Sequence, residues 1–333
     1  MLPLAAPATV DALAAEATAH LDGLGPLQRL FDDPAVDEVM VNGGGEVWID
    51  RAGALTSIGR LQTGVVERII ERVLDPLGRR LDRLTPMVDA RLGNGSRVCA
   101  VVTPVAVDGT CLSVRRFSVR PRALTDFASE SVADLLREAI ERRCNTIVEG
   151  PTSSGKTSLL NTLAGCVGGN ERIVTLEDTA ELRLAAPHVL RLEARPPSAD
   201  GAPPVTLADL VRTALRLRPD RLVVGEIRGA EVVDLLQALN TGHDGSLSTC
   251  HANSPADALT RLHSLVVQHH AGWPLAAVRD HIRRCVDLVV HVARGADGAR
   301  RVVTVAEPQV GTDEMRVLVQ DGNVVAPITR GRR

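Results

Sequence analysis

A glycine-rich segment near the middle of the sequence has the residue types and spacing of a phosphate-binding loop. Residues 150–157 read Gly-Pro-Thr-Ser-Ser-Gly-Lys-Thr, a full match to the pattern G-x-x-x-x-G-K-[ST]. The glycines of such a loop let successive backbone N–H groups curl around a phosphate, and the following helix adds its positive dipole end. Lys156 can then reach the β- and γ-phosphates, while the Thr157 hydroxyl can bind Mg²⁺. The segment therefore predicts a nucleotide site.

The lysine of this loop is unusual within its own sequence. Of the 38 lysine and arginine residues, Lys156 is the only lysine. Arginine has replaced lysine wherever a general cation suffices, but a planar guanidinium does not substitute for a compact ammonium enclosed by a phosphate loop. This argues against the alternative of an ordinary glycine loop with an accidental lysine. The loop residues expected to bind the nucleotide are Gly150, Pro151, Thr152, Ser153, Ser154, Gly155, Lys156, Thr157 and Ser158.

Two acidic residues that follow predicted strands could complete the site. Glu177 comes directly after the apolar run 173–176, and Glu226 ends the run Leu-Val-Val-Gly-Glu. The carboxyl ends of parallel strands meet at one edge of a sheet, so both side chains should approach the phosphates. One could orient the attacking water, and either could join Thr157 in holding Mg²⁺, through its water shell. Taken alone, each could instead be a helix cap or a solvated turn, and the sequence does not decide which is the general base.

Two histidines lie in the segment 242–251, which reads Gly-His-Asp-Gly-Ser-Leu-Ser-Thr-Cys-His. His243 or His251 near a γ-phosphate could report whether that phosphate is present. The simpler interpretation is that both are satisfied in a polar loop. Metal binding by both histidines and Cys250 is a third interpretation, without a further ligand pattern to support it.

The composition disfavours several classes of protein. The 333 residues are 44% hydrophobic, enough for two domains with buried cores. A net charge of -3 and an aromatic content of 2% argue against a nucleic-acid binder, because such proteins use positive charge and aromatic stacking. The six scattered cysteines contain no CxxC pair, so neither zinc nor a disulfide framework is expected. Neither a signal peptide nor a membrane span is expected, since no apolar run reaches about 20 residues.

The order of the predicted elements indicates two domains. Residues 1–120 mix strands and helices as a small α+β domain, residues 121–127 are the expected linker, and residues 128–333 form a larger domain. Strands and helices alternate in the larger domain, which predicts an α/β fold with a largely parallel sheet. One of its helices should begin after the N-cap Ser254. The other expected helices are 8–22, 64–75 and 132–143, and the expected strands are 36–41, 47–50, 97–102, 111–116, 146–149, 173–176, 222–224 and 288–292.

The order of four motifs resembles the type II/type IV secretion ATPase superfamily and, within it, the Tad/CpaF branch. The motifs are the phosphate loop, Thr-Leu-Glu-Asp-Thr-Ala-Glu-Leu from residue 175, Arg-Pro-Asp-Arg-Leu-Val-Val-Gly-Glu-Ile-Arg-Gly from residue 218, and Thr-Gly-His-Asp-Gly-Ser-Leu-Ser-Thr-Cys-His-Ala-Asn from residue 241. In the N-terminal half, Val-Asp-Glu-Val-Met-Val-Asn-Gly from residue 36 looks like the sensor-like domain of that branch. The similarity covers nearly the whole chain.

The resemblance implies a RecA-like P-loop NTPase domain at the C-terminus, a sensor-like domain before it, and a nucleotide between the two. It places Glu177 in an Asp box, Glu226 in an atypical Walker B motif, and His243 and His251 in a His box.

The resemblance also implies that arginines of the N-terminal domain reach the phosphates. The matching positions are Arg97, Arg115 and Arg116, although most arginines of this chain must simply be solvated. Family members form hexameric rings on the cytoplasmic face of a membrane complex. The chain lacks the four-cysteine zinc module of many type II secretion ATPases, so no zinc is expected.

The leading hypothesis is a cytoplasmic hexameric ATPase at the inner face of the membrane, which works with platform proteins to assemble Tad/Flp-type pili or to secrete protein. Lys156, Glu177, Glu226, His251 and Arg115 would be its catalytic residues. The alternative is a conjugation-associated nucleic-acid translocase, disfavoured by charge and composition. A third hypothesis is a nucleotide-gated scaffold that hydrolyses almost no ATP, which the intact pair of carboxylates disfavours.

Overall fold

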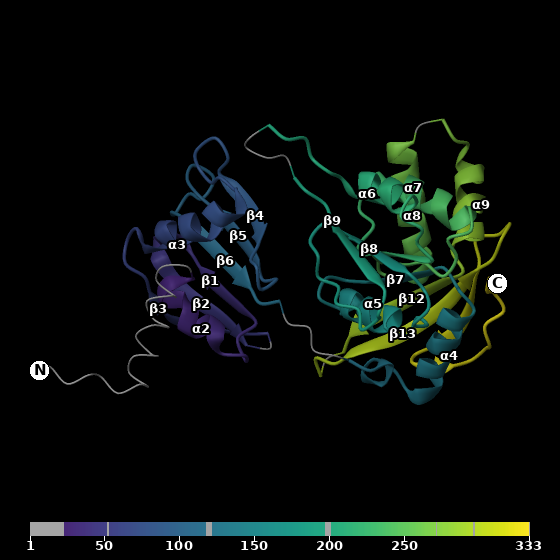
Figure 1. Ribbon diagram of the computed structural model, residues 1–333. Helices are drawn as coiled ribbons and strands as arrows, with labels where there is room; N and C mark the ends of the chain where they lie inside the picture. The colour runs from purple at the N-terminus through teal and green to yellow at the C-terminus, as the bar shows by residue number, and fades with distance from the viewer. Residues whose placement is uncertain are drawn as a thin grey trace, which may run out of the picture. The chain divides into compact units, whose positions relative to one another are not determined.

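Figure 1 shows the computed structural model of the protein, which describes residues 23–51, 53–117, 122–196, 201–270, 272–295 and 297–332. The chain forms two compact units. The first is Met1–Val119 with Pro197–Pro203, and the second is Arg120–Pro196 with Pro204–Arg333. The helix expected over residues 8–22 lies outside the described residues.

The first unit is an antiparallel sheet covered on one face by helix α3. Within the described residues its six strands have the order β3-β2-β1-β6-β5-β4. Buried and more exposed residues alternate along β1, β5 and β6, as expected for strands with one face against a core. Helix α3 buries Val66, Ile69, Ile70 and Val73 on that core because apolar residues recur every three or four positions. The elements are η1 (Gly25–Leu27), α2 (Gln28–Asp32), β1 (Glu38–Val41), η2 (Gly43–Gly45), β2 (Glu46–Arg51), β3 (Ala54–Arg60), α3 (Val65–Leu74), η3 (Asp75–Leu77), β4 (Met87–Arg91), β5 (Arg97–Val101) and β6 (Cys111–Arg115).

The second unit is built on a larger sheet that is parallel over most of its width. In the described part of the chain, nine strands have the order β15-β14-β13-β12-β7-β11-β10-β8-β9. The strands from β12 to β9 are parallel, whereas β13, β14 and β15 add antiparallel pairs at one side. The strands are β7 (Thr146–Gly150), β8 (Ile173–Glu177), β9 (Val189–Glu193), β10 (Arg221–Val224), β11 (Leu247–His251), β12 (Leu288–Arg294), β13 (Arg300–Pro308), β14 (Met315–Gln320) and β15 (Asn323–Val324).

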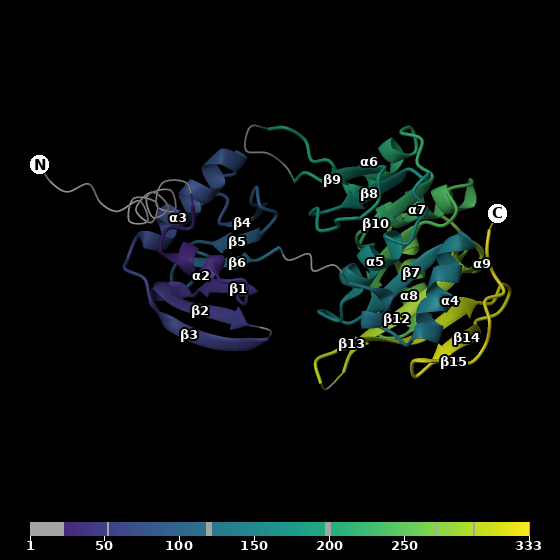
Figure 2. The same ribbon diagram turned by 60° about the horizontal axis from the view of Figure 1, so that its bottom comes forward.

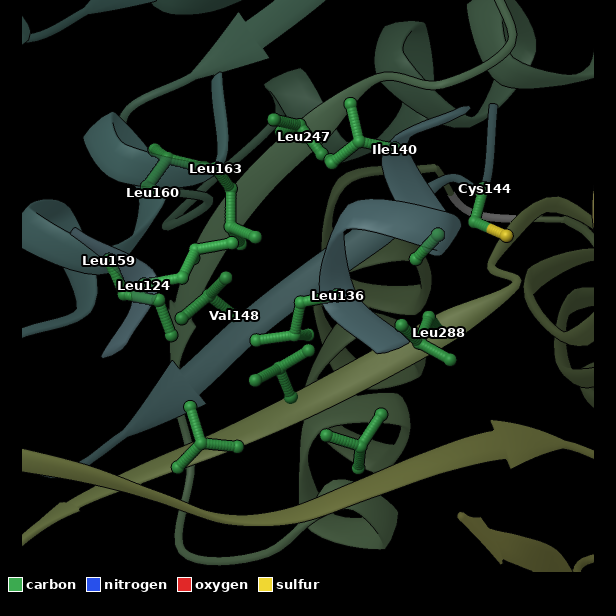
Figure 3. Close-up of a cluster of buried hydrophobic side chains, with 14 of the residues drawn as sticks. Leu124, Leu136, Ile140, Cys144, Val148, Leu159, Leu160, Leu163, Leu247 and Leu288 are labelled. Carbon is green, nitrogen blue, oxygen red and sulfur yellow. The ribbon is translucent and has the colours of Figure 1, made fainter. Parts of the chain in front are cut away.

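Helices cover both faces of this sheet (Figures 1 and 2). Val148 of β7 faces the core under α4 and α5, together with Leu136 and Leu160, as Figure 3 shows. Its neighbour Ile147 faces the opposite core, under α6 to α9. Strands buried on both faces read as continuous apolar runs, which is why the sequence pattern identified β7, β8, β10 and β12. The helices are η4 (Leu124–Asp126), α4 (Glu130–Glu141), α5 (Lys156–Ala164), α6 (Leu207–Ala214), α7 (Glu231–Asn240), α8 (Pro255–His269) and α9 (Leu275–Cys285).

The predicted α/β fold, preceded by a smaller α+β unit, is confirmed. The expectation did not include strands β3, β4, β9, β13, β14 and β15. Two further differences concern residues 247–251 and the expected linker. Residues 247–251, expected within a loop, form β11, an interior strand between β7 and β10. Residue 121 of the expected linker lies outside the described residues, but Leu124 and Phe127 pack into the core of the second unit because burial stabilises apolar side chains. None of the helices among the described residues has the length and hydrophobicity needed to cross a bilayer.

A buried ion pair holds the amino ends of β8 and β10. The Arg221 side chain is 2% exposed and donates from Nε and Nη2 to the two carboxylate oxygens of Glu171, both at 2.8 Å. Its Nη1 donates to the carbonyl oxygen of Ile140 at 2.9 Å. This guanidinium lowers the pKa of Glu171 below its usual value, against the effect of burial. Arg143 also pairs with Glu171, so removing Arg221 would leave that half-buried carboxylate with a single cation and would leave the carbonyl oxygen of Ile140 without this donor.

We expect Arg221→Ala to lower the free energy of unfolding of the second unit by about 3 kcal/mol. Urea unfolding followed by Trp273 fluorescence in a Trp48→Phe background measures this, because Trp273 lies in the second unit and Trp48 in the first. Arg137→Ala is the matched control, since Arg137 makes only exposed ion pairs, with Glu130 and Asp134. Equal losses of unfolding free energy in Arg221→Ala and Arg137→Ala would contradict the stabilising role of Arg221.

Candidate functional site

The predicted phosphate loop connects β7 to α5 at the carboxyl edge of the second sheet. Two glycines are required by its geometry. A Cβ on Gly150 would collide with the carbonyl oxygen of Val292 in the neighbouring strand β12. Gly155 has φ +101°, in the left-handed region that favours glycine, and directly precedes α5. Thr157 and Ser158 lie in the first turn of α5, after Lys156. The loop thus has a shape that only this glycine spacing allows.

Lys156 is buried at the base of the loop, with 7% of its surface exposed. Its ammonium donates to the carbonyl oxygens of Gly150 and Pro151, each at 2.9 Å. Nζ also lies 3.2 Å from Nδ1 of His251. Burial lowers the pKa of Lys156, and the nearby charge of Glu226 opposes that shift. The lysine is therefore held by three acceptors from two neighbouring strands and the loop.

His251 connects the lysine to a carboxylate. It ends β11, where its backbone is in register with Gly150 of β7. Its Nε2 lies 2.9 Å from Oε1 of Glu226, and the other carboxylate oxygen of Glu226 accepts from Arg228. Lys156, His251, Glu226 and Arg228 therefore form one chain of contacts along the carboxyl edge of the sheet.

The protonation of His251 follows from its neighbours. An ammonium has no acceptor atom, so Nδ1 must accept from Lys156. A neutral imidazole then carries its proton on Nε2, which faces Glu226. Burial lowers the pKa of His251; Lys156 and Arg228 lower it further, whereas Glu226 raises it. These effects favour the neutral ring with one defined tautomer.

Glu177 ends β8 and is 2% exposed. Its Oε1 accepts from the backbone N–H groups of Glu181 and Leu182, both at 2.9 Å. Its Oε2 is buried and has no hydrogen-bond partner among the described residues. Burial raises the pKa of Glu177 to about 7, although the two backbone donors pull it down. The side chain packs beside Gly225, the residue before Glu226, so both acidic residues reach the same edge.

His243 does not reach this edge. It lies before the amino end of β11, in a loop whose Gly245 and Ser246 backbone N–H groups bond to Asn145. Its Nδ1 is 3.3 Å from the carbonyl oxygen of Ala238. His243 is therefore at the opposite end of β11 from His251, which corrects its expected place at the nucleotide. Because the two histidines lie at opposite ends of β11, they cannot share a metal ion with Cys250. Burial also raises the pKa of the Cys250 thiol to about 12, which disfavours the thiolate that a metal ion needs.

The arginines of the first unit fall into two groups. Arg97 of β5 and Arg115 of β6 are in register, and Arg91 of β4 is next in the same row. Arg97 and Arg115 lie on the face opposite the buried Val98 and Val114, which turn inward. The row continues from Arg115 to Glu38 of β1 and Asp50 of β2, so the three arginines stand beside two carboxylates.

Arg116 has a structural role instead of the expected contact with phosphate. Its guanidinium donates to the carbonyl oxygens of Val36 at 2.7 Å, Asp33 at 2.8 Å and Phe31, and it stacks over the Phe31 ring at 4.6 Å. These contacts fix the turn that leads into β1.

Two further groups support the site and were not predicted from the sequence. Glu231, at the start of α7, accepts from the N–H of Gly229 at 2.8 Å and so fixes the turn that carries Glu226 and Arg228. An acidic residue in the first turn of a helix was the available signal. Glu149, directly before the loop, is fully buried, and its Oε1 lies 2.7 Å from Nδ1 of His291. No local pattern in the sequence marks that pair.

Comparison with known families decides the assignment. The family described as "Type II/IV secretion system protein" matches residues 20–323. The chain belongs to this secretion family. Its resemblance to the superfamily is confirmed, and its assignment to the Tad/CpaF branch stays a prediction.

Relatives and solved structures agree with this family. A putative conjugal transfer protein of Mycobacterium tuberculosis is 40% identical over 300 residues, covering 86% of this chain and 85% of the relative. The type IV secretion system protein PtlH of Bordetella pertussis is 34% identical over 325 residues, covering 85% and 92%. The pilus retraction motor PilT with bound ADP has a TM-score of 0.63 at 20% identity, covering 90% of this chain and 83% of PilT. At this identity the similarity to PilT concerns the fold alone, and it confirms the predicted RecA-like C-terminal domain.

The raised pKa of Glu177 predicts how stability changes with pH. Its neutral form is favoured in the folded protein, so its contribution to stability is complete below its ordinary pKa and is lost as pH rises through about 7. Glu177→Gln keeps the hydrogen-bond acceptor and removes the charge. In metal-free buffer, we expect this variant to gain about 2–3 kcal/mol of unfolding free energy over the wild type between about pH 5 and pH 8.

Urea denaturation at several pH values measures this difference. Glu141→Gln, at an exposed position at the end of α4, is the matched control and should show no such change. A difference between Glu177→Gln and wild type that stays constant with pH would contradict the assignment.

Proposed function

We propose that this protein is an ATPase that drives assembly of Tad/Flp-type pili, or protein secretion, through a membrane complex. ATP binds at Gly150–Thr157, on the carboxyl edge of the second sheet. The observation that carries the proposal is the contact chain from Lys156 through His251 to Glu226. It supports hydrolysis because it links the predicted phosphate loop to a carboxylate that can orient water.

The roles of these residues follow from their chemistry. The Lys156 ammonium neutralises charge on the β- and γ-phosphates. Glu226, whose Oε2 accepts from Arg228 and whose Oε1 has no partner among the described residues, accepts a hydrogen bond from the attacking water on the same side of the loop. His251 keeps its Nε2 proton on the side of Glu226, whose Oε1 lies 2.9 Å away and has no hydrogen-bond partner among the described residues. Since positioning and charge stabilisation dominate phosphoryl transfer, rigid placement of these groups is what the site must supply.

Three residues fit a Mg²⁺ ion. The buried Oε2 of Glu177 lacks a partner among the described residues, and a carboxylate oxygen of this kind suits a hard divalent cation. The Thr157 hydroxyl is one residue beyond Lys156, and Glu226 is the neighbouring strand-end carboxylate. Bound Mg²⁺ would neutralise and orient the phosphates. Thr157 would be a direct ligand, with Glu177 and Glu226 acting through its water shell.

We also propose a hexameric ring in the cytoplasm, on the inner face of the membrane, bound to platform proteins. Membership of the secretion family supports this assembly. Arg97 and Arg115, from the row on the first unit, would supply cations to phosphates of their own or a neighbouring subunit. Sites completed by a neighbouring subunit would be active only in the assembled ring.

A second candidate is a nucleic-acid translocase of conjugation. The names of relatives favour it, because they include the putative conjugal transfer protein of Mycobacterium tuberculosis. The net charge of -3 weighs against it, since binding to nucleic acid depends on neutralising phosphates.

We expect the ATPase rate per protomer to rise with protein concentration and then level off, because the competent site needs neighbouring subunits. Phosphate release measured over a wide range of protein concentration tests this expectation. A measurable rate that is independent of concentration would contradict completion of the site in an assembling ring.

Lys156→Ala is the control for this assay and should lower turnover by about 100-fold or more, because it removes a charge that stabilises the transition state. Near-normal turnover by that variant would refute the proposed site. Addition of DNA separates the two candidate functions. Steep stimulation that added salt abolishes would favour the translocase, and no stimulation would favour the secretion motor.

A further inference from the structure

Arg300 reaches the phosphate loop from the hairpin that joins β12 to β13. Strand β12 lies beside β7, with His291 in register with Glu149 and Val292 beside Gly150, and it continues two residues further to the hairpin turn. Arg300 is the first residue of β13, opposite Arg294. Its Nη1 donates to the Ser158 hydroxyl at 3.3 Å. The whole side chain follows the loop, because a Cβ on Gly155 would be only 2.5 Å from the Arg300 Cδ.

The loop therefore has a cation on each side. The strand order β12-β7-β11 places the Arg300 hairpin on one side of β7 and His251 on the other. Lys156 contacts His251, toward Glu226, whereas Arg300 contacts Ser158, two residues further along α5. These two cations mark different ends of any polyphosphate that lies along the loop.

The order of the phosphates follows from this asymmetry. A phosphate-loop lysine reaches the β- and γ-phosphates, while the loop backbone holds the α- and β-phosphates. The terminal phosphate then lies on the side of Lys156, His251 and Glu226, where water can be oriented. The inner end of the chain lies on the side of Ser158 and Arg300.

We propose that Arg300 binds the inner phosphate of the nucleotide and so holds ADP and ATP alike. This inference rests on the proposed nucleotide-binding function. A guanidinium has five N–H donors in a planar fork, so Arg300 can bond to Ser158 and to a phosphate oxygen together. Its contact forms before and after hydrolysis, which makes Arg300 a binding residue for substrate and product, in contrast to Glu226.

The test compares ligands that differ only in the terminal phosphate. Equilibrium binding of Mg·ADP and of a non-hydrolysable Mg·ATP analogue is measured for the wild type and Arg300→Ala. We expect both affinities to fall by about ten-fold, by the same factor, because a charge-assisted hydrogen bond common to both ligands is lost. The affinity for inorganic tripolyphosphate, measured by competition, should fall by a similar factor.

Arg301→Ala is the matched control, since Arg301 is the next residue on the same strand but bonds to Asp297 of the hairpin. It should bind both nucleotides as the wild type does. Arg300→Lys, which keeps the charge without the planar fork, should lose less affinity than Arg300→Ala. It also serves as the test variant if circular dichroism shows that Arg300→Ala is unfolded.

Several outcomes would overturn the inference. Unchanged affinity for both nucleotides would exclude a contact, and a loss confined to the ATP analogue would place Arg300 at the terminal phosphate. If the affinities for both nucleotides fell while the affinity for tripolyphosphate stayed unchanged, Arg300 would contact the nucleoside and not a phosphate. Failure of the wild type to bind either nucleotide would refute the proposed function itself. Selective failure of Arg300 variants, with binding still dependent on Lys156, leaves that function intact.

Discussion

The burial of one ammonium group organises the candidate site. Lys156 is almost excluded from solvent, and a buried charge is tolerated only where acceptors surround it. The carbonyl oxygens of Gly150 and Pro151 supply two acceptors, and the ring of His251 supplies the third. That third acceptor is available because β7 and β11 are parallel neighbours in register, so His251 arrives beside the loop. The tautomer of the histidine then follows from the lysine, and it leaves the Nε2 proton on the side of Glu226.

The sheet explains why the polar groups gather where they do. Both of its faces are covered by apolar cores, so charged side chains collect mainly at the ends of its strands. The amino ends carry structural ion pairs, such as Arg221 with Glu171, whose donors and acceptors are matched within the fold. At the carboxyl edge the matching is incomplete, because Glu177 keeps a buried oxygen without a partner among the described residues. What sets the carboxyl edge apart is that its unpartnered buried atom is a carboxylate oxygen, which can bind a cation or a water molecule.

Local sequence patterns predicted the residues whose place depends on a single strand end. The phosphate loop, Glu177 and Glu226 each follow an apolar strand directly, so the parallel-sheet rule sufficed to place them at one edge. His243 and His251 are only eight positions apart, and no pattern showed that β11 lies between them and separates them. Arg116 and Arg300 depend on distant partners, the carbonyl oxygens near Phe31 and the hydroxyl of Ser158, which one sequence does not reveal. Contacts between distant segments thus set the limit of prediction.

The central claim is that the side of the loop marked by His251 receives the terminal phosphate. Isothermal titration of His251→Ala with Mg·ADP and with a non-hydrolysable Mg·ATP analogue tests it most directly. The account predicts about ten-fold weaker binding of the ATP analogue and a smaller loss for ADP, because Lys156, which His251 holds, reaches the γ-phosphate of ATP as well as the β-phosphate that both ligands share. His243→Ala, altered at the opposite end of the same strand, should bind both ligands as the wild type does. Equal losses for ADP and the ATP analogue in His251→Ala, or any loss in His243→Ala, would contradict the account.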